Sequence, residues 1–561
     1  MYRLFKTHQI RKSIELPTLW EFSVPDKTPI KMPVPSCIES IPAFSNYKGK
    51  CTFEAQCRFS NDLRLTFKGV GHTANVYLDG QHLGSHYGAY GEFSFVLKNQ
   101  KDEKHTITVN ADNSYSTDSA LHIDNDYYSY LGITRPMILE QLDRVYVKYT
   151  HITPSYDGVK WKIHITSEIE NITDSDIDIN VVYFLSTSDS CAKNDDDVTE
   201  YTQFPVHIKS GDTKKIEYIM NCSDVITYTP ENPYMYFLHC QLITATGNEA
   251  IDDLIERFGF REIKVAGKEI LFNGTPLKIK GFNRHEDYAE FGCSVPVSAM
   301  QRDIMLIKET GANCIRTCHY PNDERFLDLC DENGILVWEE SHARGLSEEN
   351  MLNPNFMEQS KLSIFEMITY HFNHPSIFVW GLLNECASET EYGRKCYEEL
   401  IGLIRDLDPS KPVTFASCKH FKDICLDLAD IVSYNIYPKW YRETSCVDFL
   451  SDCVDYIREN GGANKPILIS EIGAGAIYGY RTNTRCKWSE EGQVDMLYQQ
   501  ITSVMSNSEC SGVIIWQFAD CRVDAGWALK RPKTQNNKGV VDMYRREKLG
   551  YEKVKELFKN L

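Results

Sequence analysis

The sequence lacks a long hydrophobic run. Its longest uncharged apolar stretch spans residues 376–383, whereas a helix that crosses a membrane needs about 20 apolar residues. The first twelve residues include basic side chains but no apolar segment like that of a secretory signal peptide. We therefore expect no membrane association and a cytoplasmic location.

The cysteines lack the spacing of a metal site. There are 19 of them, an odd number, between Cys37 and Cys521, and no C-x-x-C pair has a second pair at zinc spacing. We interpret them as thiols in a reducing compartment. A Gly-rich phosphate loop and a Ser-His-Asp pattern are also missing, so we expect no metal and no cofactor. His285 could suggest a metal ligand, but we interpret it as a structural hydrogen-bonding histidine.

Positive charge is scarce as well. The chain has 60 basic and 79 acidic residues, which gives a net charge of -19. Such a surface disfavours binding to nucleic acids and anionic membranes. A negatively charged substrate would have to be recognised by a local cation.

The chain is long enough for several domains. At about 100 to 200 residues per domain, and up to about 250 for a barrel, its 561 residues predict three. The hydrophobic fraction of 42% is that of a globular protein. Short alternating segments predict a β-sandwich over residues 1–148 and an immunoglobulin-like β-sandwich over 149–265.

Residues 266–561 have a different pattern, in which short apolar strands alternate with amphipathic stretches. This pattern is typical of a (β/α)8 barrel, which carries its chemistry at the carboxyl ends of the strands. The expected strands are 277–282, 313–317, 335–339, 377–384, 413–416, 431–437, 467–471 and 512–518. The expected helices include 298–309, 356–372, 391–407, 492–505 and 546–561.

Two of the expected barrel strands run into carboxylates. The fourth leads to Asn384 and Glu385, and the seventh ends at Glu471. Carboxylates are rarely buried without a partner, so both need an explanation. A facing pair suits glycoside hydrolysis, in which one carboxyl protonates the leaving oxygen and the other attacks the anomeric carbon. The alternative is that both are ordinary strand-end acids paired with basic loop residues.

Several segments together resemble glycoside hydrolase family 2, and in particular its bacterial β-glucuronidases. They are 281–286 (Gly-Phe-Asn-Arg-His-Glu), 311–321, 373–376 followed by 380–385 (Trp-Gly-Leu-Leu-Asn-Glu), and Ser470-Glu471. The resemblance covers nearly the whole chain. It implies an N-terminal jelly-roll β-sandwich, an immunoglobulin-like β-sandwich and a C-terminal catalytic TIM barrel.

The resemblance also implies roles for the strand-end residues. Glu385 corresponds to the acid/base and Glu471 to the nucleophile of a retaining reaction that passes through a covalent glycosyl-enzyme intermediate. The acid then needs a raised pKa, while the nucleophile must stay ionised. Arg316 and Tyr437 match residues that support the nucleophile, and Asn384 one that holds the sugar 2-hydroxyl. Arg316 could equally be a buried ion-pair partner inside the barrel.

The resemblance implies a uronic acid as the sugar. Asn536 and Lys538 form an Asn-x-Lys triplet like the one with which family β-glucuronidases hold the C6 carboxylate. The alternative is an ordinary solvated basic loop. Asp126 matches an aspartate that the jelly-roll domain extends into the barrel mouth, which would make the enzyme exo-acting. Further positions resemble sugar contacts: His319, Asn435, Tyr437, Tyr441, Trp516 and Arg531.

Two departures from the family pattern concern loops. Cys386 follows Glu385 where many relatives have proline, and the loop 341–353 is shorter than the loop that covers the site in some glucuronidases. The short loop predicts an open leaving-group side.

The sequence thus predicts a homo-oligomeric retaining exo-β-D-glucuronidase acting on glucuronide conjugates or glucuronate-terminated oligosaccharides. The alternatives are a family 2 enzyme for β-galacturonides or β-galactosides, and a non-catalytic carbohydrate-binding protein.

Overall fold

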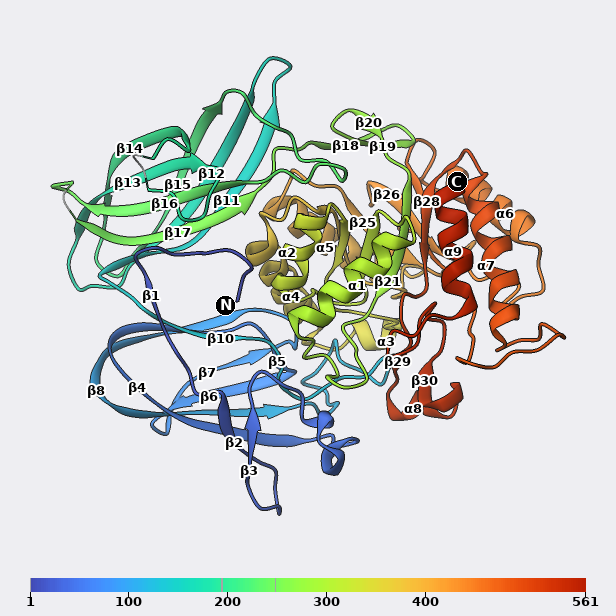
Figure 1. Ribbon diagram of the computed structural model, residues 1–561, viewed down its shortest axis with the longest axis horizontal. Helices are drawn as coiled ribbons and strands as arrows, with labels where there is room; N and C mark the ends of the chain where they lie inside the picture. Colours follow the sequence, from blue (N-terminus) through green and yellow to red (C-terminus); the bar gives the residue numbers. More distant parts are fainter. Residues whose placement is uncertain (1, 193–194, 248) are drawn as a thin grey trace.

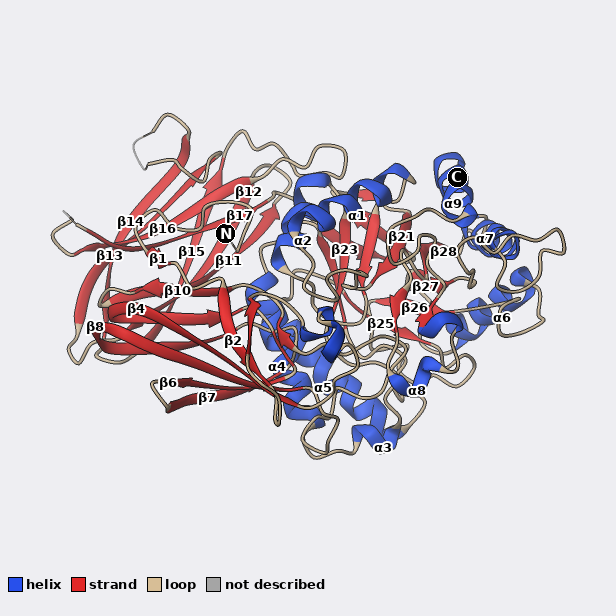
Figure 2. Ribbon diagram, turned by 60° about the horizontal axis from the view of Figure 1, so that its bottom comes forward, coloured by secondary structure: helices blue, strands red, loops and turns tan. Residues whose placement is uncertain are grey.

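The computed structural model describes residues 2–192, 195–247 and 249–561. Two β-rich regions lie on one side of the molecule, and a barrel with its helices lies on the other (Figure 1). In Figure 2 the long strands of the β-rich regions are separated from the part in which helices surround the barrel strands.

The first β-rich region, at the lower left of Figure 1, is built on an eight-stranded sheet in the order β1-β10-β4-β8-β6-β7, with β2 paired to β4 and β3 paired to β2. Its apolar side chains alternate along the strands and form one buried core that includes Trp20, Phe53 and Leu139. The strands are β1 (Lys12–Ile14), β2 (Leu19–Ser23), β3 (Ile30–Pro33), β4 (Lys50–Phe67), β5 (Val70–Gly71), β6 (Thr73–Leu78), β7 (Gln81–Tyr87), β8 (Phe93–Asp112), β9 (Gly132–Ile133) and β10 (Met137–Gln141).

The second β-rich region packs a three-stranded sheet, β11-β12-β15, against a four-stranded sheet, β14-β13-β16-β17. All the pairings in both sheets are antiparallel. The strands are β11 (Val145–Tyr156), β12 (Trp161–Asn171), β13 (Ile177–Ser186), β14 (Val198–Ile208), β15 (Thr213–Cys222), β16 (Tyr236–Thr244) and β17 (Ala250–Phe258). A small sheet of β18 (Ile263–Ala266), β19 (Glu269–Phe272) and β20 (Thr275–Pro276) leads into the barrel.

Eight parallel strands close into a barrel in sequence order, as expected for a TIM barrel. They are β21 (Ile279–Arg284), β22 (Cys314–Thr317), β23 (Leu336–Glu340), β24 (Ile377–Gly381), β25 (Val413–Ser417), β26 (Ile431–Asn435), β27 (Ile467–Ile472) and β28 (Cys510–Ile515). Each overlaps one of the predicted strands. The fourth is shorter than predicted, because the chain leaves the sheet at Gly381 and takes left-handed backbone angles at Leu383 and Glu385.

Helices surround the barrel, and all of them except the short α8, which has no buried residue, bury apolar side chains against it. They are α1 (Val297–Glu309), α2 (Glu324–Asn333), α3 (Glu348–Met351), α4 (Phe356–His371), α5 (Glu391–Leu407), α6 (Cys446–Glu459), α7 (Glu490–Met505), α8 (Ala525–Ala528) and α9 (Leu549–Asn560). Short 3-10 turns are η1 (Ile38–Ser40), η2 (Pro42–Phe44) and η3 (Pro532–Thr534), and β29 (Cys521–Arg522) pairs with β30 (Gln535–Asn536). None of the helices in the described residues is long and apolar enough to span a membrane.

A loop of the first β-rich region, residues 113–131 between β8 and β9, reaches onto the barrel. Tyr115 bonds to Asp524, and the Tyr130 hydroxyl donates to Asp287 at 3.0 Å. The same loop carries Asp126, which is buried. The first region therefore supplies part of the barrel mouth.

Candidate active site

A cavity of about 430 Å³ lies where the barrel strands end. Its walls come from β26 and β27, from the segments that follow β23, β24, β25, β26 and β28, from α6 and from the loop 113–131. The lining residues are Asp126, Arg344, Glu385, Cys418, His420, Asn435, Tyr437, Tyr441, Arg442, Phe449, Glu471, Trp516, Trp527, Arg531 and Lys538.

Glu385 enters the cavity from the segment after β24. Its backbone N–H donates to the Ala416 carbonyl at 2.9 Å, which holds the residue in a left-handed conformation with φ of 53°. Non-glycine residues rarely adopt such angles, and those that do cluster at functional sites. The Asn435 amide donates to one carboxylate oxygen at 3.0 Å, and Arg344 lies 3.4 Å from the other.

Glu471, on β27, lines the same cavity and is held from two sides. Arg316 donates to one carboxylate oxygen at 2.9 Å and the Tyr437 hydroxyl donates to the other at 2.5 Å. Burial and the nearby charge of Glu385 raise the pKa of Glu471 to about 7, although Arg316 and Tyr437 act in the opposite direction. The raised pKa differs from the expectation that this carboxyl ionises easily, and the cause is its removal from water.

A second layer of charge lies beneath the two carboxyls. Arg316 is completely buried and also donates to Glu340, the last residue of β23, at 2.8 Å. Glu340 pairs with Nδ1 of His319 at 2.9 Å, and burial raises the pKa of Glu340 to about 7. His319 does not line the cavity but stacks behind Trp516, with ring centroids 5.1 Å apart. Arg316 thus forms ion pairs with both Glu340 and Glu471.

Asn384 lies beside Glu385 and is fully buried. Its side-chain oxygen accepts from Arg316 at 2.7 Å and from Asn435 at 3.2 Å. Its amide nitrogen has no hydrogen-bond partner among the described residues. Since a buried donor without a partner is costly, this nitrogen is a candidate contact for a substrate hydroxyl.

A charged cluster forms part of the cavity wall. Asp126 accepts from Nε of Arg531 at 2.9 Å and from the Asn536 amide at 3.0 Å. Asn536 is fully buried behind Asp126 and does not line the cavity. The structure brings Asn536 to Asp126, and its contact with a substrate carboxylate stays a prediction.

Lys538 differs from Arg344 and Arg531, two other cations of the cavity wall. It is only 3% exposed, and its ammonium lies 5.3 Å from the ring centre of Tyr441 and 5.7 Å from that of Tyr437. No carboxylate of the part of the chain that the structure describes pairs with it, whereas Arg344 pairs with Glu385 and Arg531 with Asp126. The Lys538 charge lowers the pKa of Tyr441 despite the opposing effect of burial.

Most of the site residues predicted from the sequence meet in this cavity. Nine line it directly, and the other four, Arg316, His319, Asn384 and Asn536, lie behind the wall. Sequence reasoning missed Glu340 and Arg344. Glu340 carries the same signal as Glu471, a carboxylate at the end of a barrel strand, while Arg344 lies in a loop whose sequence has no distinguishing pattern.

The family of this chain follows from comparison with known proteins. Residues 263–560 match the family described as glycosyl hydrolases family 2, TIM barrel domain. The chain belongs to this family. The matched segment begins at β18 and contains all eight barrel strands, so it includes both cavity glutamates.

Family 2 relatives cover the two β-rich regions as well. A crystal structure of a GH2 β-galacturonidase from Eisenbergiella tayi, bound to galacturonate, is 48% identical, has a TM-score of 0.96 and spans 100% of this chain and 99% of its own. A β-glucuronidase from Sus scrofa is 26% identical over 92% of this chain and 83% of its own length. A β-glucuronidase from Streptococcus agalactiae is 28% identical over 82% and 79%.

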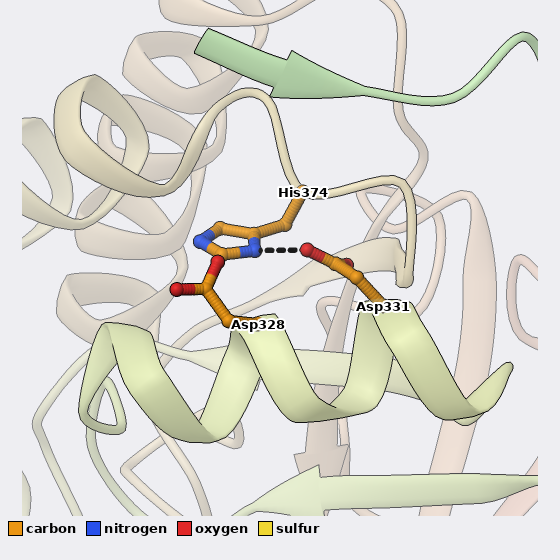
Figure 3. Close-up of side chains that lie close together, drawn as sticks. All are labelled: Asp328, Asp331 and His374. Atoms are coloured by element: carbon orange, nitrogen blue, oxygen red, sulfur yellow. Dashed lines mark hydrogen bonds and ion pairs between the residues drawn. The ribbon is translucent and has the colours of Figure 1, made fainter. Parts of the chain in front are cut away.

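The family 2 barrel also holds a group of acids and a histidine away from the cavity. Asp328 and Asp331 of α2 lie beside His374 (Figure 3). Arg3 donates to Asp328 at 2.8 Å, and Asp331 accepts from the Ser376 hydroxyl and from His374, each at 2.6 Å. Arg257 of β17 donates to Asp328 at 3.1 Å. Because the carboxylates are already engaged, we interpret the group as an ion-pair network that joins the β-rich regions to the barrel.

Proposed function

We propose that the protein is a retaining, exo-acting β-uronidase whose preferred substrates are terminal β-D-galacturonides. The observation that carries the proposal is the buried cation Lys538 in the cavity that also contains Glu385 and Glu471. A buried charge needs a counter-charge. The C6 carboxylate of a uronic acid would supply it.

In the proposed reaction, Glu385 protonates the glycosidic oxygen while Glu471 attacks the anomeric carbon. The leaving group departs as an alcohol, and the sugar stays bound to Glu471 as an ester. Glu385, now ionised, takes a proton from water, which then releases the sugar with its original anomeric configuration. The amide nitrogen of Asn384 donates to the sugar 2-hydroxyl, filling the position that lacks a partner.

The exo mode of action is proposed from the charged cluster in the cavity wall. Asp126, Arg531 and Asn536 form a hydrogen-bonded barrier there, so a chain could not extend past the terminal sugar. Asp126 still has free acceptor capacity for a sugar hydroxyl, since a carboxylate offers about four lone-pair sites.

The choice between the two uronic acids is based on similarity. The relative that is 48% identical over the whole chain acts on β-galacturonides, while the β-glucuronidases from Sus scrofa and Streptococcus agalactiae are 26% and 28% identical. These two support β-D-glucuronides as the second candidate. Galacturonic and glucuronic acid differ only in the orientation of the 4-hydroxyl, which Lys538 does not read.

Aryl β-D-galacturonide, β-D-glucuronide and β-D-galactoside should be cleaved at different rates. We expect kcat/KM for the galacturonide to exceed that for the glucuronide by about tenfold or more, a typical value for one misplaced polar group. The galactoside lacks the carboxylate and should be the poorest substrate. Preference for the glucuronide would select the second candidate, and equal cleavage of the galactoside would contradict a role for Lys538.

Replacing Tyr437 by phenylalanine should change the pH dependence. Glu471 must be ionised to attack, so with a pKa of about 7 the rate falls as the pH drops below that value. The Tyr437 hydroxyl stabilises the ionised form. Its loss should therefore raise the pKa of Glu471 and move the acidic limb of kcat/KM to higher pH by about one unit. The alkaline limb is the internal control, and an unmoved acidic limb would contradict the assignment.

A further inference from the structure

One part of the cavity wall has no role in the proposed reaction. Arg442, from the loop after β26, lines the cavity together with His420 and with Phe449 of α6. The Arg442 guanidinium lies 5.0 Å from the ring centre of Phe449. The His420 ring meets the same phenylalanine edge-on, with centroids 5.2 Å apart. These three residues form a cationic and aromatic wall.

This wall lies on the leaving-group side. His420 donates to the Asn435 carbonyl at 2.7 Å, and the Asn435 amide donates to Glu385, which in the proposed reaction protonates the glycosidic oxygen. Asp126 and Arg531, which pair with each other, form another part of the cavity wall. A group that leaves from Glu385 would therefore meet the loops after β25 and β26.

The charge of Arg442 is not neutralised within the protein. No carboxylate of the described residues pairs with it, although the residue is exposed at the rim and the chain is strongly acidic. Phe449 is 3% exposed and fixed in α6, so its contact limits the positions of the guanidinium before any ligand binds. An unpaired arginine held against an aromatic ring suits a planar carboxylate.

We propose that Arg442, Phe449 and His420 form a subsite that binds a leaving group carrying a carboxylate, either an aromatic acid or an acidic sugar. This inference rests on the proposed uronidase function and adds the class of leaving group. The glycone carboxylate is read by Lys538 and the leaving-group carboxylate by Arg442. Arg442 is then a specificity-determining residue and has no part in bond cleavage.

A matched pair of substrates tests the inference. They are the 3-carboxyphenyl and 3-carbamoylphenyl glycosides of the uronic acid that the protein cleaves, which have similar shape and differ in charge. The wild-type protein should prefer the carboxylate by about tenfold in kcat/KM, and salt should weaken the preference. In Arg442→Gln the ratio should fall to about one, while kcat/KM for the carbamoyl substrate should stay within about twofold of wild type.

The control variant is Arg302→Gln, which changes an exposed arginine of α1 outside the cavity wall and should keep the preference for the carboxylate.

A second pair of substrates shows whether the natural leaving group is an acidic sugar. It consists of a disaccharide with a second uronic acid as leaving group and the same disaccharide with that C6 carboxylate reduced. The subsite would be overturned if the wild-type protein cleaved the charged and the neutral member of both substrate pairs with equal kcat/KM. It would also be overturned if Arg442→Gln lowered kcat/KM for both members by the same factor. Cleavage of neither aryl substrate would overturn the uronidase function, and the subsite with it.

Discussion

Replacing Glu471 by alanine is expected to lower kcat for an aryl uronide by a factor on the order of 10⁴ or more. The variant has no carboxylate to form the covalent intermediate, and Arg316 and Tyr437, which hold Glu471 in the native protein, cannot substitute for it. Initial rates measured against a matched wild-type preparation check the loss. Glu459→Ala, which changes an exposed glutamate at the end of α6, should keep full activity.

Azide distinguishes the role of Glu471 from that of Glu385. In Glu471→Ala the small anion can occupy the vacated space and attack from the nucleophile side, which yields an α-glycosyl azide. In Glu385→Ala the intermediate still forms from a substrate with a good leaving group, and azide attacks it from the other side to yield a β-glycosyl azide. NMR of the products shows the configuration. The reverse pattern would exchange the two assignments, and undiminished activity of Glu471→Ala would contradict the mechanism.

The barrel could be predicted because its signal is local. Each strand is a short apolar run bounded by polar residues, such as Ile467–Ile472, and each long helix has a separate amphipathic pattern, such as Glu391–Leu407. Eight such units in order leave few alternative topologies. Helices α2 and α6 were not among the helices named from the sequence, although the apolar residues of α6, from Cys446 to Ile457, have the same amphipathic spacing.

The site could be predicted only in part, because its geometry depends on contacts between distant segments. The turn that places Glu385 needs left-handed backbone angles at Leu383 and Glu385, which no pattern of residue types indicates. The contact between Asp126 and Arg531 joins residues 405 positions apart. The resemblance to family 2 brought both residues to the site, but only the structure shows that they bind each other.

Electrostatics were the least predictable feature. A carboxylate next to an arginine is expected to ionise easily, yet burial outweighs Arg316 and raises the pKa of Glu471. Similarly, the sequence contains several cations near the end of β28, and nothing in their spacing shows that Lys530 is exposed while Lys538 is buried.

Replacing Lys538 by methionine should remove the discrimination in favour of uronides. The side chain stays unbranched and nearly as long but loses its charge, so the substrate carboxylate would be left without a partner in a buried site. Such a loss costs about 3 kcal/mol, which corresponds to a roughly 100-fold decrease in kcat/KM for the uronide. Activity on the matching neutral glycoside should stay the same or rise, because the empty site no longer buries an unpaired charge.

The test depends on comparing the effect on the uronide with the effect on the matching neutral glycoside. A structural role for Lys538, for instance in positioning Tyr441, would lower both activities by the same factor, and that outcome would contradict the assignment. Lys530→Met is the matched control, since it removes an exposed lysine of the same loop that does not line the cavity. It should leave both activities unchanged. In a chain with a net charge of -19, specificity for an anionic sugar would then depend on one buried ammonium group, and substrate carboxylate and Lys538 would neutralise each other only in the complex.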